Sequence, residues 1–211
     1  PMSQALSKMR VGILRFPYGH LADNYLWKAR PHDQKADGLQ PKVASMSLPP
    51  GNWSWAVKPD GSMPSAMDFD EYMALCQKIG AKALVCVNVL AFKYPNGPTY
   101  EQLKSSAVAW VKYARQQHYQ VAYWQIGNEV DHGGNKKLLP MNEYMALYED
   151  FARSMKEADP NAQIGPGILS SPANARAISQ KCPELVDFSS VHQYMYAWQK
   201  TCSKYVGWRA C

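Results

Sequence analysis

Five short apolar runs alternate with amphipathic segments along most of the chain. Most of their residues are apolar and do not alternate strictly with polar ones, which is typical of strands that are covered on both faces in a parallel sheet. The runs lie at residues 11–15, 84–89, 121–126, 162–165 and 188–191. The pattern predicts a sheet of about five parallel strands.

Amphipathic segments between these runs predict helices at residues 68–79, 99–117 and 142–158. The first two open on Asp or Thr, followed three residues later by Glu or Gln, which is the spacing of a capping box. A fourth, short helix is expected to start at Ser171 and Pro172, a cap residue followed by a proline at the first helical position. Strand and helix in alternation, at a repeat of about 30 to 40 residues, predict an α/β fold of the barrel type.

One connection is much longer than the others. Residues 16–67 lie between the first predicted strand and the first predicted helix and are rich in Pro, Gly and Trp. A loop of this length in a compact domain is usually functional or disordered, and its aromatic content argues against disorder. Its tryptophans, Trp53 and Trp55 among them, either stack on a ligand or hold the loop in place.

The composition is that of a globular protein, with 46% hydrophobic and 19% charged residues among 211, so we expect residues 1–211 to form a single domain. The net charge of +6 is scattered without a basic stripe, which argues against nucleic-acid binding. No apolar run reaches the roughly 18 residues of a membrane span, and no signal peptide is recognisable, so the compartment stays open.

The five cysteines include no CxxC pair and do not fix the redox compartment. Cys76 and Cys86 lie inside apolar segments and are expected to be buried. Cys202 and Cys211 could pair in oxidising surroundings. The histidines lack the spacing of metal ligands, so we expect no metal and no cofactor.

Polar residues stand at the ends of four of the five predicted strands. Arg15, Asn88, the pair Asn128 and Glu129, and then His192 with Tyr194 lie at these ends. In parallel α/β folds the carboxyl ends of the strands form the active site. Taken singly, Glu129 could cap a helix or form a surface ion pair, His192 could be a core histidine, and Arg15 could be a buried ion-pair partner. Their recurrence at one edge favours a site.

The stretch YWQIGNEVD resembles the strand end that marks the retaining glycoside hydrolases of clan A, (β/α)8 barrels whose acid/base Glu follows an Asn at the end of the fourth strand. Other stretches resemble the α-L-arabinofuranosidase-like branch. LRFPYGHLADNYLW is similar to its second-strand RYPGGN segment, and VDFSSVHQY to its sixth strand. DFDEYMALCQKIGAKALVCVNV and EYMALYEDFARSMKEADPNAQIGPG are similar to the helix and strand pairs between them. The resemblance covers about residues 5–196.

The resemblance implies a hydrolase of O-glycosidic bonds in poly- or oligosaccharides. Such hydrolysis passes through an oxocarbenium-like transition state and needs a carboxylic acid to protonate the leaving oxygen. The resemblance implies that Glu129 is the acid/base and that Asn128 hydrogen-bonds the sugar 2-OH. It implies that Arg15 supports the nucleophile site and that the glycone subsite is lined by Asn88, His192 and Tyr194. The loop residues Trp53 and Trp55 would stack on sugar faces. The alternative is a degenerate barrel that binds carbohydrate without cleaving it.

The chain departs from the family pattern in one respect. It matches barrel strands two to six, whereas the family nucleophile is a Glu after strand seven, and no acidic residue follows Tyr194. A full barrel needs about 250 residues, so a partial TIM-type barrel is expected. Asp131, Asp23, Asp37 or a partner chain could supply the second carboxylate. Unpaired edge strands invite pairing, so a homo-oligomer is expected.

Overall fold

The computed structural model describes residues 2–28, 39, 41–44, 57–63, 66–168 and 171–192. The helices are α1 (Met2–Lys8), α2 (Phe69–Ile79), α3 (Tyr100–Gln116), α4 (Asn135–Leu138), α5 (Met141–Ala158) and α6 (Pro172–Lys181). The strands are β1 (Ile13–Phe16), β2 (Tyr25–Leu26), β3 (Lys42–Val43), β4 (Lys82–Val87), β5 (Val121–Ile126), β6 (Ile164–Ile168) and β7 (Ser190–Val191). Short 3-10 turns are η1 (Gly19–Asp23), η3 (Ala91–Lys93) and η4 (Pro183–Leu185).

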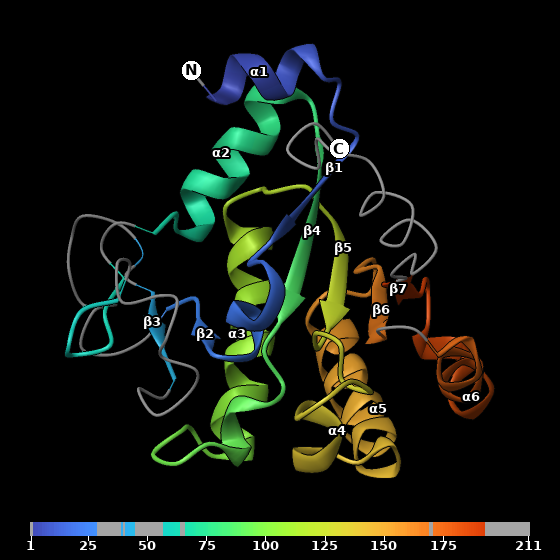
Figure 1. Cartoon of the computed structure of the whole chain (residues 1–211). Helices are drawn as coiled ribbons and strands as arrows, with labels where there is room; N and C mark the ends of the chain where they lie inside the picture. The colour runs from blue at the N-terminus through green and yellow to red at the C-terminus, as the bar shows by residue number, and fades with distance from the viewer. Residues whose placement is uncertain are drawn as a thin grey trace, which may run out of the picture.

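Five strands form one parallel sheet in the order β1-β4-β5-β6-β7, which is also their order along the chain (Figure 1). Phe16 of β1 lies opposite Val85 of β4, and Val85 lies opposite Trp124 of β5. All four strand pairs are parallel, so the carboxyl ends lie at one edge. The predicted parallel sheet of about five strands is confirmed.

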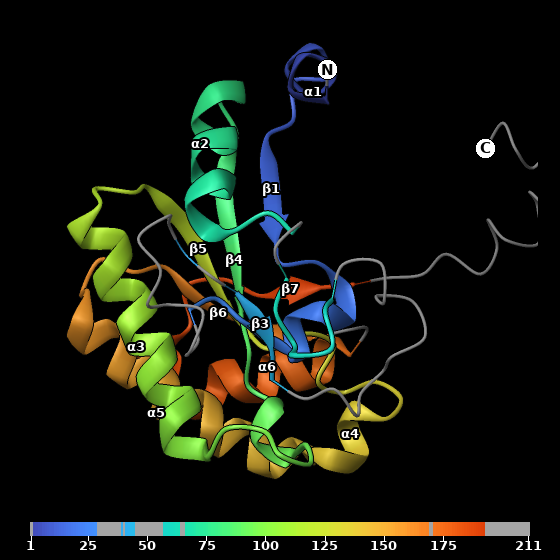
Figure 2. The ribbon, with the colours of Figure 1, turned by 90° about the vertical axis from the view of Figure 1, so that its left-hand side faces the viewer.

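Helices α2, α3 and α5 lie on one side of the sheet (Figure 2). Their apolar stripes bury a core in which Trp110 of α3 stacks on Trp27 at a ring-centroid distance of 5.5 Å and meets Phe69 of α2 edge-on at 5.3 Å. The Trp27 indole also donates a hydrogen bond of 3.1 Å to the backbone oxygen of Ser106. A tryptophan from the start of the long connection is therefore part of the core.

The helices begin where the sequence predicts. The Asp68 carboxylate accepts from the Glu71 backbone N–H at 2.9 Å, and the Glu71 carboxylate accepts from the Asp68 N–H at 3.0 Å, which completes a capping box. Thr99 and Gln102 form the same box at the start of α3. Ser171 caps α6 by accepting from the Asn174 N–H.

Strands β1, β4, β6 and β7 differ from the sequence prediction by one to three residues at one or both ends, and for β4 and β6 the cause is local. Strand β4 ends at Val87, because the Asn88 side chain accepts from the backbone N–H groups that follow and starts a turn. Strand β6 runs on to Ile168 through Gly165 and Gly167, residues that normally interrupt a strand. Both glycines are needed for close approach, since a Cβ would clash with the Phe188 and Gly127 carbonyl oxygens respectively.

The described parts of residues 16–67 contain η1 and an antiparallel pair of β2 and β3, in which Tyr25 lies opposite Val43. Trp53, Trp55, Asp37, Tyr194, Cys202 and Cys211 lie outside the described residues. Cys76 and Cys86 are buried and free, as predicted. No helix among the described residues is long and apolar enough to cross a membrane.

Candidate active site

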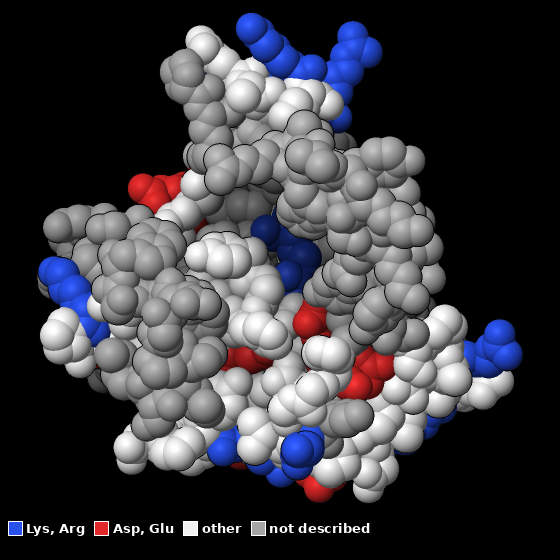
Figure 3. Space-filling model, in the orientation of Figure 1, with Lys and Arg blue, Asp and Glu red and all other residues white. Residues whose placement is uncertain are grey.

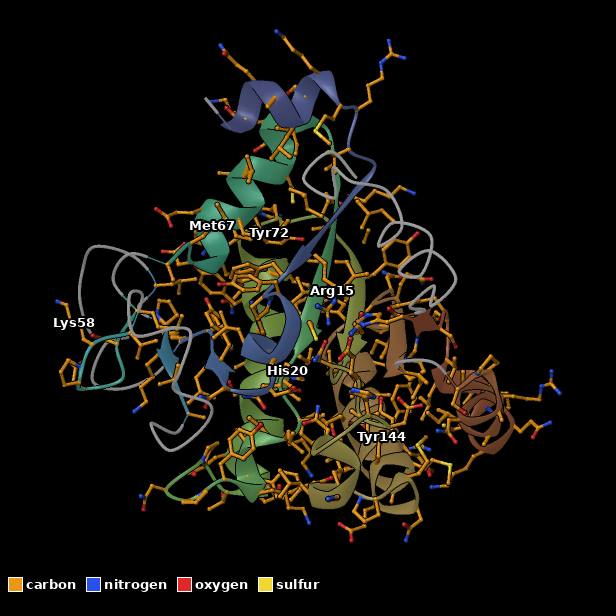
Figure 4. The ribbon with its side chains drawn as sticks, in the orientation of Figure 1. Arg15, His20, Lys58, Met67, Tyr72 and Tyr144 are labelled. Carbon is orange, nitrogen blue, oxygen red and sulfur yellow. The ribbon has the colours of Figure 1, made fainter. Side chains whose placement is uncertain are left out.

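The face of the sheet opposite α2, α3 and α5 is hollowed at its centre, with basic atoms on the floor of the hollow and acidic atoms beside it (Figure 3). In the same orientation, Arg15 lies at this place, at the carboxyl end of β1, and His20 lies just below it (Figure 4). Arg15, one of the strand-end residues singled out in the sequence, therefore lies in the hollow.

The turn after β5 has an unusual backbone. Gly127 has φ of +82° and Glu129 has φ of +46°, both in the left-handed region. A Cβ on Gly127 would lie 2.7 Å from a Val130 methyl carbon and 3.0 Å from a Val89 methyl carbon, so only glycine fits. Non-glycine residues in this conformation are uncommon and cluster at functional sites. The turn directs Glu129 away from the strand and towards the end of β7.

Glu129 and His192 meet, although they are 63 positions apart. The His192 Nδ1 lies 2.8 Å from the Glu129 Oε1, and Glu129 is only 8% exposed. A neutral imidazole can donate Nδ1–H to the ionised carboxylate or accept a hydrogen bond from the protonated acid, depending on its tautomer. The imidazole therefore holds the Glu129 carboxyl group in place at the edge of the sheet.

Arg15 and Asn128 are also brought together. The Arg15 Nη2 donates to the Asn128 Oδ1 at 2.8 Å, and its Nε donates to the Gln125 Oε1 at 3.3 Å. The same Nη2 lies 3.2 Å from the Cys86 sulfur, and burial raises the pKa of that thiol to about 12. Gln125 and Cys86 thus help to hold Arg15 in the floor of the hollow, a role that nothing in their sequence context reveals.

On its other side, the Asn128 amide reaches Asp23 of η1. The Asn128 Nδ2 donates to the Asp23 Oδ2 at 3.4 Å, and the Asn135 Nδ2 donates to the same oxygen at 3.2 Å. The His20 Nδ1 lies 3.7 Å from it, an ion-pair distance. Asp23 is 2% exposed. Burial raises the pKa of Asp23, against the contributions of its three hydrogen-bonding neighbours.

Asp23 raises the pKa of His20 in turn, with a smaller contribution of the same sign from Glu129. Of these residues, the sequence singled out Asp23 only as a candidate base. The sequence gives His20 no metal-ligand spacing and no other role, and it gives no signal for Asn135, which is an isolated Asn.

Two other candidates have partners away from this network. The Asn88 amide donates to the Tyr25 backbone oxygen at 3.2 Å, and its oxygen accepts from the Leu90 and Ala91 N–H groups. Asp131 accepts from the Asn174 side chain at 3.1 Å. No cluster of three or more potential metal ligands occurs among the described residues.

A parallel sheet in chain order, with helices between its strands and an acid at the end of one of them, defines a partial barrel of the (β/α)8 type. The chain matches an α-L-arabinofuranosidase from Thermotoga maritima, solved with arabinose, at a TM-score of 0.66 and 20% identity over 96% of this chain and 41% of that one. It matches the GH51 α-L-arabinofuranosidase of Thermotoga petrophila at a TM-score of 0.64 and 20% identity, over 95% and 43% of the two chains.

Among curated sequences, the chain is 24% identical over 209 residues to the intracellular exo-α-(1→5)-L-arabinofuranosidase of Acetivibrio thermocellus, a match that covers 90% of this chain and 38% of that protein. No family model matches. The chain is thus a distant homologue of the GH51 α-L-arabinofuranosidases and spans about 40% of their length.

Proposed function

We propose that the protein is a glycoside hydrolase that uses Glu129 as general acid/base. The observation that carries this proposal is the 2.8 Å contact between Glu129 and His192, formed next to an Asn128 amide that Arg15 anchors. The names of the homologues make terminal α-L-arabinofuranosyl groups the first substrates to test.

In this mechanism Glu129 protonates the leaving oxygen while positive charge develops on the sugar ring. The Asn128 amide offers a hydrogen bond to the sugar 2-OH, a contact that strengthens in the transition state. His192 stabilises the carboxylate that Glu129 becomes, and Glu129 then removes the proton of an attacking water. Tyr194, Trp53 and Trp55 are proposed to complete the sugar-binding surface.

Hydrolysis also needs a second carboxylate, as nucleophile or base. The Asp23 Oδ2 already has the side chains of Asn128, Asn135 and His20 around it, which argues against a role for Asp23 as nucleophile or base. Asp131 is partly exposed and is held by Asn174, which leaves it as the better candidate of the two. A carboxylate from outside the described residues is the other source.

The test compares hydrolysis by the wild type and Glu129→Gln on aryl α-L-arabinofuranosides whose leaving groups span a range of acidity. A missing general acid lowers the rate most for the most basic leaving group, by about 10² to 10⁴-fold. Glu157→Gln, an exposed position on α5, is the matched control. Equal loss across all leaving groups, or no loss, would rule out the role of Glu129 as acid.

The same proteins are titrated with arabinose and arabino-oligosaccharides by calorimetry. Binding without hydrolysis in the wild type would favour the alternative, a barrel that binds carbohydrate and does not cleave it. Hydrolysis that disappears in Glu129→Gln while binding persists supports the enzyme.

We also propose that the protein self-associates along β1. This strand is the outer one of the described sheet on its side, and Ile13 within it is 48% exposed. Such edges pair readily with a second chain. Light scattering that shows only monomer at working concentration would contradict this proposal.

A further inference from the structure

Asp23 is a buried carboxyl group that does not come from a strand end. It lies in η1, and its Oδ2 is approached by the side chains of Asn128, Asn135 and His20. Its 2% exposure rules out a solvated surface charge. A buried acid with this many donors around it is either a structural element or part of the site.

The first contact fixes the Asn128 side chain. An amide has an acceptor end and a donor end, and the two differ only by a rotation of the group. Here the Arg15 cation donates to the oxygen at 2.8 Å, and the Asp23 oxygen accepts from the nitrogen at 3.4 Å. Only one orientation satisfies both neighbours, and the rotated amide would face each charge with the wrong end.

The second contact fixes the backbone of the same turn. The Asn135 Nδ2 that donates to Asp23 also lies 3.1 Å from the Asn128 carbonyl oxygen and 3.4 Å from that of Glu129. Glu129 has its left-handed φ of +46° at this point. Asp23 thus reaches both the amide that is proposed to bind substrate and, through Asn135, the turn that carries the acid.

The carboxyl group is retained against a stability cost. Burial raises the pKa of Asp23, which means that the fold disfavours its charged form relative to the unfolded chain. An uncharged side chain of the same shape would avoid this cost. Groups of this kind are more common at functional sites than in structural cores.

We propose that Asp23 is a positioning residue that orients the Asn128 amide and holds the turn at Asn128 and Glu129 through Asn135. It acts through these groups and does not contact the sugar. The expected effect of Asp23 on catalysis rests on the proposed function. The effect of Asp23 on Asn128 and His20 can be observed without any activity.

The test uses the full chain with Asp23→Asn, which keeps the shape and one acceptor oxygen but removes the charge. We expect kcat on an aryl α-L-arabinofuranoside to fall about 10- to 100-fold, the equivalent of one hydrogen bond to a charged group, with a smaller change in KM. The melting temperature at neutral pH should stay equal or rise. A purely structural role predicts a lower melting temperature instead, and that result would overturn the proposal.

Two NMR measurements separate this proposal from the proposed function. The side-chain amide signals of Asn128 should shift in Asp23→Asn, and the pKa of His20, raised in the wild type, should fall. Asp70→Asn is the matched control, because Asp70 accepts hydrogen bonds from Tyr113 and has no contact with the network.

If the wild type does not hydrolyse the substrate but both signals respond, the proposed function fails and the positioning of Asn128 stands. If kcat, the amide signals and the His20 pKa are all unchanged, the positioning role is wrong. Should Asp23→Asn not fold, the wild-type titration decides alone: a His20 pKa at or below 6.5, its ordinary value, would contradict a charged Asp23 beside it.

Discussion

Asn88 and Asn128 follow neighbouring parallel strands, β4 and β5, and both are almost completely buried. Asn88 turns back on the backbone and accepts from the Leu90 and Ala91 N–H groups. Asn128 lies between two ionisable side chains, Arg15 and Asp23. The same residue type at the same edge therefore builds a turn in one place and a polar network in the other, and the difference comes from the partners that the neighbouring segments supply.

The largest loss of activity is expected when the asparagine at the end of β5 is replaced. Replacing Asn128 by Ala removes the proposed contact to the sugar 2-OH and leaves Arg15 and Asp23 without their shared partner. We expect kcat/KM on an aryl α-L-arabinofuranoside to fall about 10²- to 10³-fold, as for other transition-state hydrogen-bond donors. Steady-state kinetics measure this. An Asn128→Ala enzyme within a few-fold of wild type would show that the two asparagines do not differ in function.

Gly127 allows the tight turn that follows β5 and that carries Asn128 and Glu129. Replacing it by Ala places a methyl group 2.7 Å from Val130 in a backbone with φ of +82°. Overpacking of this kind destabilises by about 1–3 kcal/mol, and the left-handed backbone adds to it. Urea unfolding followed by circular dichroism gives the free energy of unfolding. Gly133→Ala is the control, since its φ is also positive but nothing lies within 4 Å of a new Cβ.

Replacement of the asparagine after β4 is expected to lower stability and to leave activity nearly unchanged. Asn88→Ala leaves two buried backbone N–H groups and the Tyr25 carbonyl oxygen without their partner, which costs about 1–3 kcal/mol of stability. Activity per folded molecule should change little, because Asn88 lies apart from the contacts of Glu129. A large fall in kcat at unchanged stability would instead place Asn88 in the sugar subsite that the family resemblance implies.

The sequence predicted the frame of the molecule better than its site. Strands and helices carry repeating apolar patterns and capping boxes, and those signals are local, so β5 and α2 were found almost to the residue. One rule about strand ends placed Glu129 and His192 at the same edge of the sheet, and the structure then shows that their side chains are in contact. Asn135 could not be found, because its role depends on three groups that only the folded chain brings together. Asn88 and Asn128 look alike in sequence for the same reason.

The smallest expected effect is a change of the free energy of unfolding with pH. It arises from Asp23, which contacts Asn128 at the end of β5, and we expect no equivalent at Asn88. The folded state raises the pKa of Asp23 above 3.8, its ordinary value. The folded protein therefore keeps the carboxyl proton in a pH range where the unfolded chain loses it. Wild-type stability relative to Asp23→Asn should therefore fall as the pH rises from about 3.8 through the folded-state pKa. The raised pKa of His20 adds a second fall of the same sign above pH 6.5.

Paired urea unfolding of the wild type and Asp23→Asn across this pH range measures the difference directly, because the two proteins differ only in Asp23 and in the pKa of groups that Asp23 shifts, such as His20. Asn88→Asp offers the reciprocal comparison at β4. There a new carboxylate would accept from the Leu90 and Ala91 N–H groups, but its second oxygen would face the Tyr25 carbonyl oxygen in place of the amide N–H. A wild-type minus Asp23→Asn difference that rises with pH would mean that the network around Asn128 stabilises the Asp23 charge more than burial opposes it.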